Sequence, residues 1–288
     1  MLQSMTGFAR QSAETALGTL TWELRAVNHR YLDLQFRIPD ELRAKEQAFR
    51  KQVGDKLKRG KVECVFHFRR AFDESTELRL NEELVDLLSA RLEAVAKSLH
   101  DAGDVNPVDV LRWPGVIEQP ELNVEPLFVE ASALLDAALE AIGEMRASEG
   151  ARLAEMLGTR CRDIGELSNA VRSRMPEVLE AARTKQRERI EKLDVEADPD
   201  RLEVELALIA SKIDVDEELD RLDSHIVEIR DTLGKEEPVG RRLDFLMQEL
   251  NREANTLASK SADTETTRAA VDLKVLIEQM REQVQNVE

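Results

Sequence analysis

The chain is poor in the residues on which several protein classes depend. Its 288 residues include two cysteines, Cys64 and Cys161, which excludes a disulfide framework and a zinc site built from cysteines. Aromatic residues make up 4%, with 12 Gly and 8 Pro, and this shortage argues against a β-sandwich or a β-barrel. No uncharged apolar run reaches the about 18 residues that a membrane-spanning helix needs, and residues 1–10 lack the apolar run of a signal peptide. We therefore expect a soluble, cytoplasmic protein with no membrane contact.

What the chain does contain is enough apolar material for a folded core and many charges. Hydrophobic residues make up 42% and charged residues 34%, so wholesale disorder is excluded. The length fits one large domain or two ordinary ones. A net charge of -17 argues against nucleic acid as a partner, provided that the charge is spread evenly.

The charge is not spread evenly. Residues 1–72 hold 14 Lys and Arg against 8 Asp and Glu, a net charge of +6, whereas residues 73–288 carry -23. The basic excess is densest in the basic segment, residues 43–61. One interpretation is an ordinary solvated helix face, and the other is a surface that follows RNA phosphates. The residues that we expect to contact RNA there are Arg50, Lys51, Lys58, Arg59 and Lys61.

Hydrophobic periodicity predicts strands first and helices afterwards. Apolar and polar residues alternate within residues 2–37 and 61–70, which predicts strands there. Between them a helix is expected to run from Asp40, its N-cap, to Leu57. Asn81 is expected to cap a helix that runs to about His100, and Asn106-Pro107 to start a short helix. Further helices are expected over the following segments: 125–193 with a break at Pro176, 202–233, 242–258 and 264–284. The fold class is therefore α+β, with a small β-rich N-terminal domain at 1–124, a long helical middle at 125–198 and a helical C-terminal domain at 199–288.

Motif searches exclude the common catalytic signatures. The sequence has no Walker loop, no Rossmann glycine triplet, no G-x-S-x-G and no H-E-x-x-H. Of the four histidines, His225 alone lies beside acidic residues at the edge of an apolar helical stripe. Glu218 precedes it by seven residues, which is about 20° around a helix, and Arg221 lies between them.

The next predicted helix carries matching acidic residues. Glu249 and Glu253 flank its apolar stripe four residues apart. His225 lies nine residues before Gly234, and Glu249 lies nine residues after Gly240. In an antiparallel hairpin both would sit at one height, about 13 Å from the loop. An imidazole and carboxylates on facing helix edges suit a hard divalent ion, Mn²⁺ or Mg²⁺.

An alternative interpretation is that these residues form ordinary ion pairs at helix edges, because Arg221, Arg241 and Arg252 lie nearby. Two features favour the metal. Like charges at i and i+4 are destabilising unless a cation lies between them. The cationic and hydroxylated residues that open and end this helix also suit a phosphate ligand, and Arg241 and Arg252 are candidates to bind it.

Long motifs also resemble a known family, the YicC/YloC proteins of bacteria. The matching segments cover nearly the whole chain in order: 4–10 (SMTGFAR), 27–33 (VNHRYLD), 59–63 (RGKVE), 106–115, 217–222 (EELDRL), His225, 240–245 (GRRLDF), 248–249 (QE), 251–256 (NREANT) and 277–283 (IEQMREQ). The resemblance implies a divalent-metal-dependent endoribonuclease, typically with manganese, that forms a ring-shaped hexamer around RNA. It also implies that Glu218, His225, Glu249 and Glu253 lie within functional motifs.

Two hypotheses follow for the function. In the first, the chain is a metal-dependent endoribonuclease, with Glu249, Glu253, His225 and Arg221 in catalysis and Glu218, His225, Glu249 and Glu253 as metal ligands. The expected partners are RNA and further copies of the chain. In the second, the chain is a non-enzymatic RNA-binding scaffold or adaptor. Incubation of the protein with RNA and either Mn²⁺ or EDTA separates the two hypotheses, since only the enzyme gives metal-dependent fragments.

Overall fold

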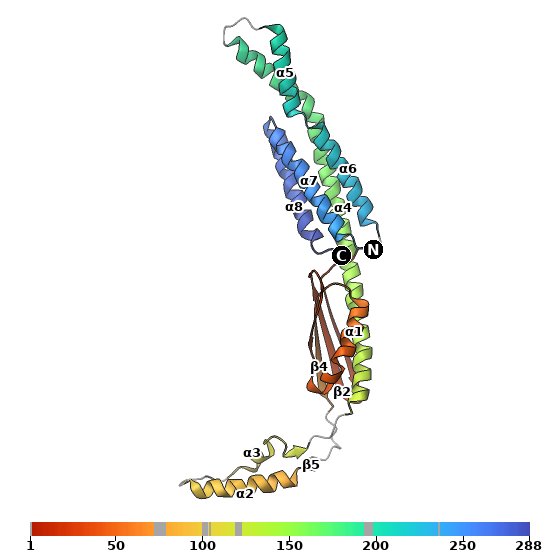
Figure 1. Cartoon of the computed structure of the whole chain (residues 1–288), viewed down its shortest axis with the longest axis vertical. Helices are drawn as coiled ribbons and strands as arrows, with labels where there is room; N and C mark the ends of the chain where they lie inside the picture. The colour runs from red at the N-terminus through yellow and green to blue at the C-terminus, as the bar shows by residue number, and fades with distance from the viewer. Residues whose placement is uncertain are drawn as a thin grey trace.

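The computed structural model is elongated and has three parts (Figure 1). A four-stranded sheet lies near the middle, a small lobe projects at one end, and a helical bundle forms the other end. One long helix, α4 (Val124–Glu191), runs from the sheet into the bundle. The structure describes residues 2–71, 79–99, 103, 105–118, 123–192, 198–235 and 237–288. The expected α+β class is confirmed.

The sheet has one apolar and one open face. Its strands, in spatial order, are β1 (Gly7–Thr15), β2 (Gly18–Val27), β4 (Gly60–Arg70) and β3 (Leu32–Arg37). The strands are antiparallel except for the edge strand β3, which runs parallel to β4. Trp22, Cys64 and Phe66 lie on the apolar face, which α1 (Glu46–Lys56) and the first half of α4 cover. Arg25 and His67 lie on the opposite face and are exposed.

The predicted strands are confirmed, but the predicted helix between Asp40 and Leu57 is divided. Its first part is a 3₁₀ helix, η1 (Asp40–Lys45), and α1 begins only at Glu46. Asp40 lies inside η1 and does not cap it, because Pro39 occupies the N-cap position and makes no side-chain cap bond. The divided helix still buries Leu42, Phe49 and Val53 against the sheet. None of the helices in the described part of the chain is long and apolar enough to cross a membrane.

The lobe at the end of the molecule is made of short elements. It consists of β5 (Arg79–Leu80), α2 (Glu82–Ser98), α3 (Pro107–Leu111) and β6 (Ile117–Glu118). The predicted caps are confirmed, since Asn81 accepts from Leu84 N and Asn106 accepts from Val108 N. Neither α2 nor α3 has a buried residue along its described length. The predicted end of α2 at His100 lies outside the described residues.

The long helix α4 is continuous, so the predicted break at Pro176 is wrong. Pro176 lies within the helix, between the buried residues Val171 and Val178. Packing on both sides of the proline therefore compensates for the one hydrogen bond that it removes. The first half of α4 belongs to the core of the sheet and the second half to the core of the bundle. The alanine-rich stretch from Ala131 to Ala141 packs on the sheet of the same chain.

The bundle is completed by four further helices. They are α5 (Pro199–Ile213), α6 (Asp216–Leu233), α7 (Gly240–Lys260) and α8 (Thr264–Val284). The predicted single helix at 202–233 is wrong, because the chain turns between α5 and α6. Asp214 accepts a hydrogen bond from Asp216 N at 3.1 Å, and Val215 is buried, so this turn is fixed by a cap-like contact and by packing. The predicted loop at 194–199 lies largely outside the described residues.

The two ends of the chain meet on α4, between the sheet and the bundle (Figure 1). Ser4 forms an antiparallel β-bridge with Val287. Arg146 of α4 is 3% exposed and donates from Nε to Ser4 O at 2.6 Å. At Gly150 an added Cβ would lie 2.1 Å from Leu2 O, so only glycine permits this close approach. These contacts fix the N-terminal body, which is the sheet with α1, against the bundle.

Candidate functional site

The seam between α6 and α7 holds the one group of metal-ligating residues found in the described part of the chain. His225 comes from α6, and Glu249 and Glu253 come from α7. One ligand atom of each residue lies within 4.8 Å of a ligand atom of the other two. The predicted hairpin geometry, with His225 and Glu249 at one height, is therefore confirmed. We call His225, Glu249 and Glu253 the seam cluster.

The local sequence explains why these side chains converge. The apolar stripe of α7, which includes Leu246 and Leu250, packs into the core and turns the adjacent edge toward α6. Glu249 and Glu253 lie on that edge, one helical turn apart. His225 lies on α6 next to the buried Ile226.

The negative charge of the seam cluster is only partly compensated. Glu253 is 3% exposed, and its one charged contact among the described residues is Arg221 Nη1 at 3.6 Å. Arg221 makes a closer ion pair with Glu217 on its own helix, at 2.5 Å. The described contacts include no hydrogen bond or ion pair of Glu249 or His225. A buried carboxylate without a close partner is costly, and a bound cation would remove that cost.

Glu218 is the predicted ligand that the structure does not bring into the cluster. Its side chain is 6% exposed and accepts from Lys260 Nζ at 2.9 and 3.0 Å. A positional signal for this pair is present in the sequence. Glu218 precedes His225 by seven residues, and Lys260 follows Glu253 by seven residues, so both lie about two turns further along the same hairpin. Lys260, which the sequence placed among the cationic residues suited to phosphate at the end of this helix, is instead paired with Glu218.

The predicted phosphate-binding arginines differ in their contacts. Arg252 and Arg241 are exposed, and neither forms an ion pair with any other described residue. By contrast, the neighbouring Arg242 pairs with Glu228 on α6. Arg252 and Arg241 are therefore free to contact an anion. Arg252 is the sequence neighbour of Glu253, whereas Arg241 lies at the start of α7, about 12 Å along the helix from Glu249.

The basic segment is divided between structural and free cations. Arg50 is part-buried, donates from Nη1 to Leu34 O at 2.8 Å and pairs with Glu46 at 2.7 Å. Arg59 donates from Nε to His29 O at 3.1 Å. These two arginines therefore hold strand and helix together.

The lysines of the basic segment are different. Lys51 is exposed and Lys61 is half-buried, and neither has a hydrogen bond or ion pair among the described contacts. Lys58 is exposed and donates only to Gly54 O, at 2.9 Å. These three lysines are the members of the predicted RNA-binding set in this segment that remain available to an external phosphate.

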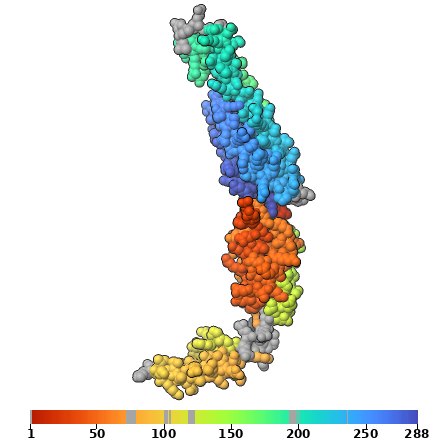
Figure 2. Space-filling model, in the orientation of Figure 1, coloured from red at the N-terminus to blue at the C-terminus, as the bar shows by residue number. Residues whose placement is uncertain are grey.

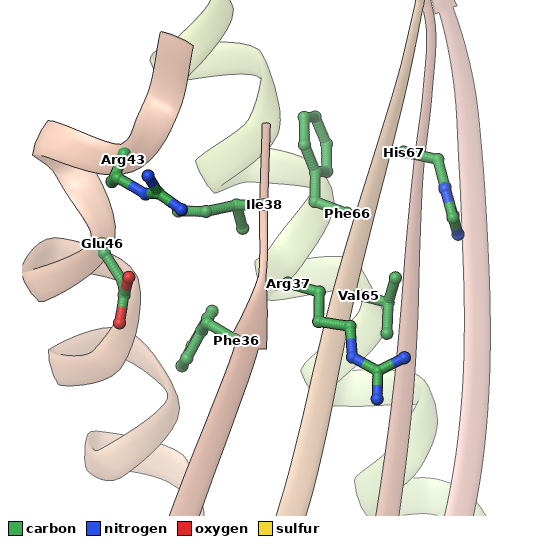
Figure 3. A pocket seen from close by; sticks show the side chains of 8 residues that line it. All are labelled: Phe36, Arg37, Ile38, Arg43, Glu46, Val65, Phe66 and His67. Carbon is green, nitrogen blue, oxygen red and sulfur yellow. The ribbon is translucent and has the colours of Figure 1, made fainter. Parts of the chain in front are cut away.

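A cavity lies at the edge of the sheet and is shown in Figure 3. Its volume is about 540 Å³, and it is formed where β3 ends and η1 begins. Figure 3 shows Arg43 and Glu46 on the helical side of β3 and His67 on the other side. Because Glu46 pairs with Arg50 and lies across the strand from His67, this cavity does not bring together ligands for a metal.

Neither cysteine contributes to a site. Cys64 lies in the sheet core and Cys161 in the bundle core, and both are free thiols. Burial raises the pKa of the Cys64 thiol to about 12 and that of the Cys161 thiol to about 11. Both thiols therefore stay protonated and unreactive near neutral pH.

Comparison with known proteins agrees with the resemblance seen in the sequence. The family model described as "Endoribonuclease YicC-like, N-terminal region" matches residues 2–155, and the one described as "Endoribonuclease YicC-like, C-terminal" matches residues 171–288. The seam cluster lies within the second match.

Two relatives match along their whole length, and both are named "Probable endoribonuclease YicC". The protein from Haemophilus influenzae is 43% identical over 288 residues, covering 100% of both chains. The protein from Clostridioides difficile is 33% identical over 293 residues, again covering 100% of both. Together, the two family matches and these full-length similarities show that the chain belongs to the YicC-like endoribonuclease family.

Proposed function

We propose that the chain is a divalent-metal-dependent endoribonuclease that acts as a ring-shaped homohexamer. The observation that carries the catalytic part is the seam cluster, in which a buried carboxylate, a second carboxylate and an imidazole converge within 4.8 Å and lack a close cation. The names of the relatives supply the substrate class, RNA.

The donor set fits a hard divalent ion. Glu249 and Glu253 offer oxygen and His225 offers nitrogen, a combination that suits Mn²⁺ or Mg²⁺ better than a structural zinc. When bound, such an ion lowers the pKa of a water and neutralises charge that builds on a phosphate. Glu218 is satisfied by Lys260 and is not needed as a ligand.

The arginines around the cluster have distinct roles in this proposal. Arg221 contacts Glu253 and Glu217, so it orients a ligand carboxylate rather than the RNA. Arg252, next to Glu253, and Arg241, at the start of α7, bind the phosphates on either side of the cleaved bond. Hydrolysis breaks one P–O bond of the RNA: water supplies the oxygen to phosphorus and a proton to the departing oxygen.

The N-terminal body holds the RNA in this proposal. Lys51, Lys58 and Lys61 attract the RNA backbone through charge and not through base recognition, because lysine is a flexible point charge. They belong to residues 1–72, which carry a net charge of +6, whereas residues 73–288 carry -23. Binding of this kind is weakened by salt.

Self-association is supported by the lobe. Val95, Leu99 and Trp113 are 54%, 58% and 56% exposed, although apolar residues of this size are usually covered. The lobe also projects away from the rest of the chain (Figures 1 and 2). We propose that it packs against another copy, and the number six is taken from the family resemblance. A monomeric mass by light scattering at micromolar concentration would contradict this part.

One experiment tests the enzymatic part. Purified protein is incubated with a labelled structured RNA in Mn²⁺ or in EDTA, and Mn²⁺ binding is measured separately by calorimetry. We expect fragments only with Mn²⁺ and one bound ion per chain. RNA binding without cleavage, together with no Mn²⁺ binding, would favour the scaffold function instead.

A further inference from the structure

A cavity of about 400 Å³ lies between α7 and α8, on the side of α7 that faces away from α6. Met247 is buried and contributes an apolar surface to it. The remaining lining is amide, hydroxyl and guanidinium, with no carboxylate. In a chain with 58 Asp and Glu against 41 Lys and Arg, a cavity lined only by neutral and cationic groups is suited to a ligand that carries negative charge.

Two asparagines give this cavity a hydrogen-bonding pattern. Asn255 Nδ2 donates to Asn251 Oδ1 at 2.8 Å. This bond leaves Asn251 Nδ2 as a donor and Asn255 Oδ1 as an acceptor, and neither has another partner among the described residues. Gln248 Nε2 donates to Asp244 at 2.9 Å, which leaves its Oε1 as a further acceptor. A donor beside an acceptor is the arrangement that reads the edge of an unpaired nucleobase.

Two arginines flank the asparagines. Arg252 has no ion pair among the described residues, and the only charged contact of Arg281 is Glu278 at 3.6 Å. An arginine with an uncommitted guanidinium binds phosphate through two parallel hydrogen bonds. The cavity therefore combines groups for a base with groups for the backbone that carries it.

The cavity and the seam cluster share α7. Gln248 and Arg252 precede Glu249 and Glu253 by one position each, so the two sites lie on adjacent faces of one helix. A helix is about 10 Å wide. A nucleic-acid strand advances about 3.4 Å per nucleotide, so about three nucleotides span this width. A strand that crosses α7 can thus occupy both sites at once.

We propose that this cavity, which we name the amide pocket, binds one unpaired nucleobase of the RNA within about three nucleotides of the cleaved bond and so determines where the strand is cut. The position of the cut rests on the proposed endoribonuclease function, whereas base binding does not. The competing interpretation is a surface amide pair that adds only helix stability, as i,i+4 pairs do.

The first measurement needs neither metal nor cleavage. In EDTA, we compare binding of a single-stranded RNA of about ten nucleotides with binding of an abasic strand that has the same backbone. We expect wild type to prefer the strand with bases by about fivefold or more. In the variant Asn251→Leu/Asn255→Leu this preference falls about threefold or more, because the side chains keep their size but lose their polar groups, while the affinity for the abasic strand is unchanged.

The matched control is Gln279→Leu, which removes an exposed amide of α8 outside the amide pocket and keeps the wild-type preference. If the double variant does not fold, the exposed Asn255→Ala alone provides the same comparison. An unchanged preference in a folded variant overturns the proposal.

The second measurement uses Mn²⁺ and sequencing of the cut ends of a random RNA. We expect wild type to show a base preference at one position near the cut, and the double variant to cleave without it. If both proteins cut with the same preference, the amide pocket proposal is wrong and the enzyme remains. If wild type does not cut at all, the proposed function is wrong, and the binding measurement still decides whether the amide pocket holds a base.

Discussion

The N-terminal body and the C-terminal bundle are built around two halves of the same helix, yet they use charge in opposite ways. In the body the lysines Lys51, Lys58 and Lys61 of the basic segment form no ion pair with any described residue. In the bundle, acidic charge that is only partly compensated converges at one point of the α6–α7 seam, where Glu253 is buried and Glu249 is half-buried. Contact with phosphate along a strand needs spread positive charge, whereas a metal needs converging ligands. We infer that RNA binding and RNA cleavage are separable along the chain.

A second comparison lies within the bundle itself. Glu218 and Glu253 are both buried carboxylates on the same seam. Glu218 has Lys260 at 2.9 Å, whereas Glu253 has only Arg221 at 3.6 Å. The fold thus places a lysine directly on the Glu218 carboxylate but, among the described residues, no cation at hydrogen-bonding distance from the Glu253 carboxylate. This difference is the physical reason to expect a cation at Glu253 and none at Glu218.

The largest expected effect is that of Glu249→Gln, which removes a ligand charge and preserves shape. We expect RNA cleavage in Mn²⁺ to fall by more than the about 10–100-fold that is typical when a residue supporting a metal ligand is changed. Wild type gains thermal stability from Mn²⁺, because an ion that binds only the folded state stabilises it by mass action. The variant loses most of that gain but keeps RNA affinity.

The control for this experiment is Glu282→Gln, an exposed position on α8 with the same chemical change, which leaves cleavage intact. His225→Ala provides a second test of the cluster from the other helix. Normal cleavage by both Glu249→Gln and His225→Ala would show that the seam cluster is an ordinary group of helix-edge residues. It would also remove the reason to assign RNA cleavage to the bundle and RNA binding to the N-terminal body.

The next effect in size concerns Glu218 and its lysine. Lys260→Met leaves the Glu218 carboxylate buried without a cation. We expect the free energy of unfolding to fall by about 2 kcal/mol, which is below the about 3–5 kcal/mol of a fully buried pair, because the Lys260 side chain is 30% exposed. Denaturant unfolding measures this loss. The stability gain from Mn²⁺ stays the same as in wild type, whereas a larger gain would mean that Glu218, once freed from Lys260, joins the metal site.

A smaller effect is expected in the N-terminal body. Reversing Lys51, Lys58 and Lys61 to Glu weakens RNA binding by about tenfold and lowers the slope of log affinity against log salt by about 2, because three phosphate contacts are lost. Exposed charges contribute little stability, so the fold and the gain from Mn²⁺ are retained. A filter-binding series over salt concentration measures the slope. An unchanged slope would remove this segment from the RNA-contacting surface.

Sequence patterns predicted where helices and strands form better than they predicted where a helix is broken or continues. The strands, the caps at Asn81 and Asn106 and the last helix follow from local periodicity and cap chemistry, which are readable in short windows. The continuity of α4 through Pro176 and the turn at Asp214 depend on tertiary packing. A short stretch of sequence does not show which distant residues will pack against it. For the same reason, the lateral convergence of His225, Glu249 and Glu253 could be predicted from hairpin symmetry, but the backbone contacts of Arg50 and Arg59 could not.

The smallest expected effect lies in the bundle away from the seam cluster, at the start of α8. Asp263 caps this helix through Thr266 N and pairs with Arg174 of α4 at 2.8 Å. Burial alone would raise the pKa of the Asp263 carboxyl, but hydrogen bonds from Thr266 and Arg174 outweigh it and lower that pKa below its ordinary value of 3.8. The charged form therefore stabilises the fold above that value, and its contribution is lost as the pH falls through the lowered pKa.

We expect Asp263→Asn to reduce the free energy of unfolding by about 1 kcal/mol or less at pH 7, since asparagine still caps the helix. The difference from wild type shrinks as the pH falls below 3.8, because the unfolded state of wild type then takes up a proton at Asp263. It is lost once the pH is below the lowered pKa, where Asp263 is neutral in the folded state as well. Urea unfolding at pH 7, 4 and 3 measures this difference. A difference that stays constant over this range would mean that the Asp263 charge does not stabilise α8. Because Asp263 lies outside the seam cluster, cleavage and the gain from Mn²⁺ should not change, which separates a structural carboxylate of the bundle from those proposed to hold the metal.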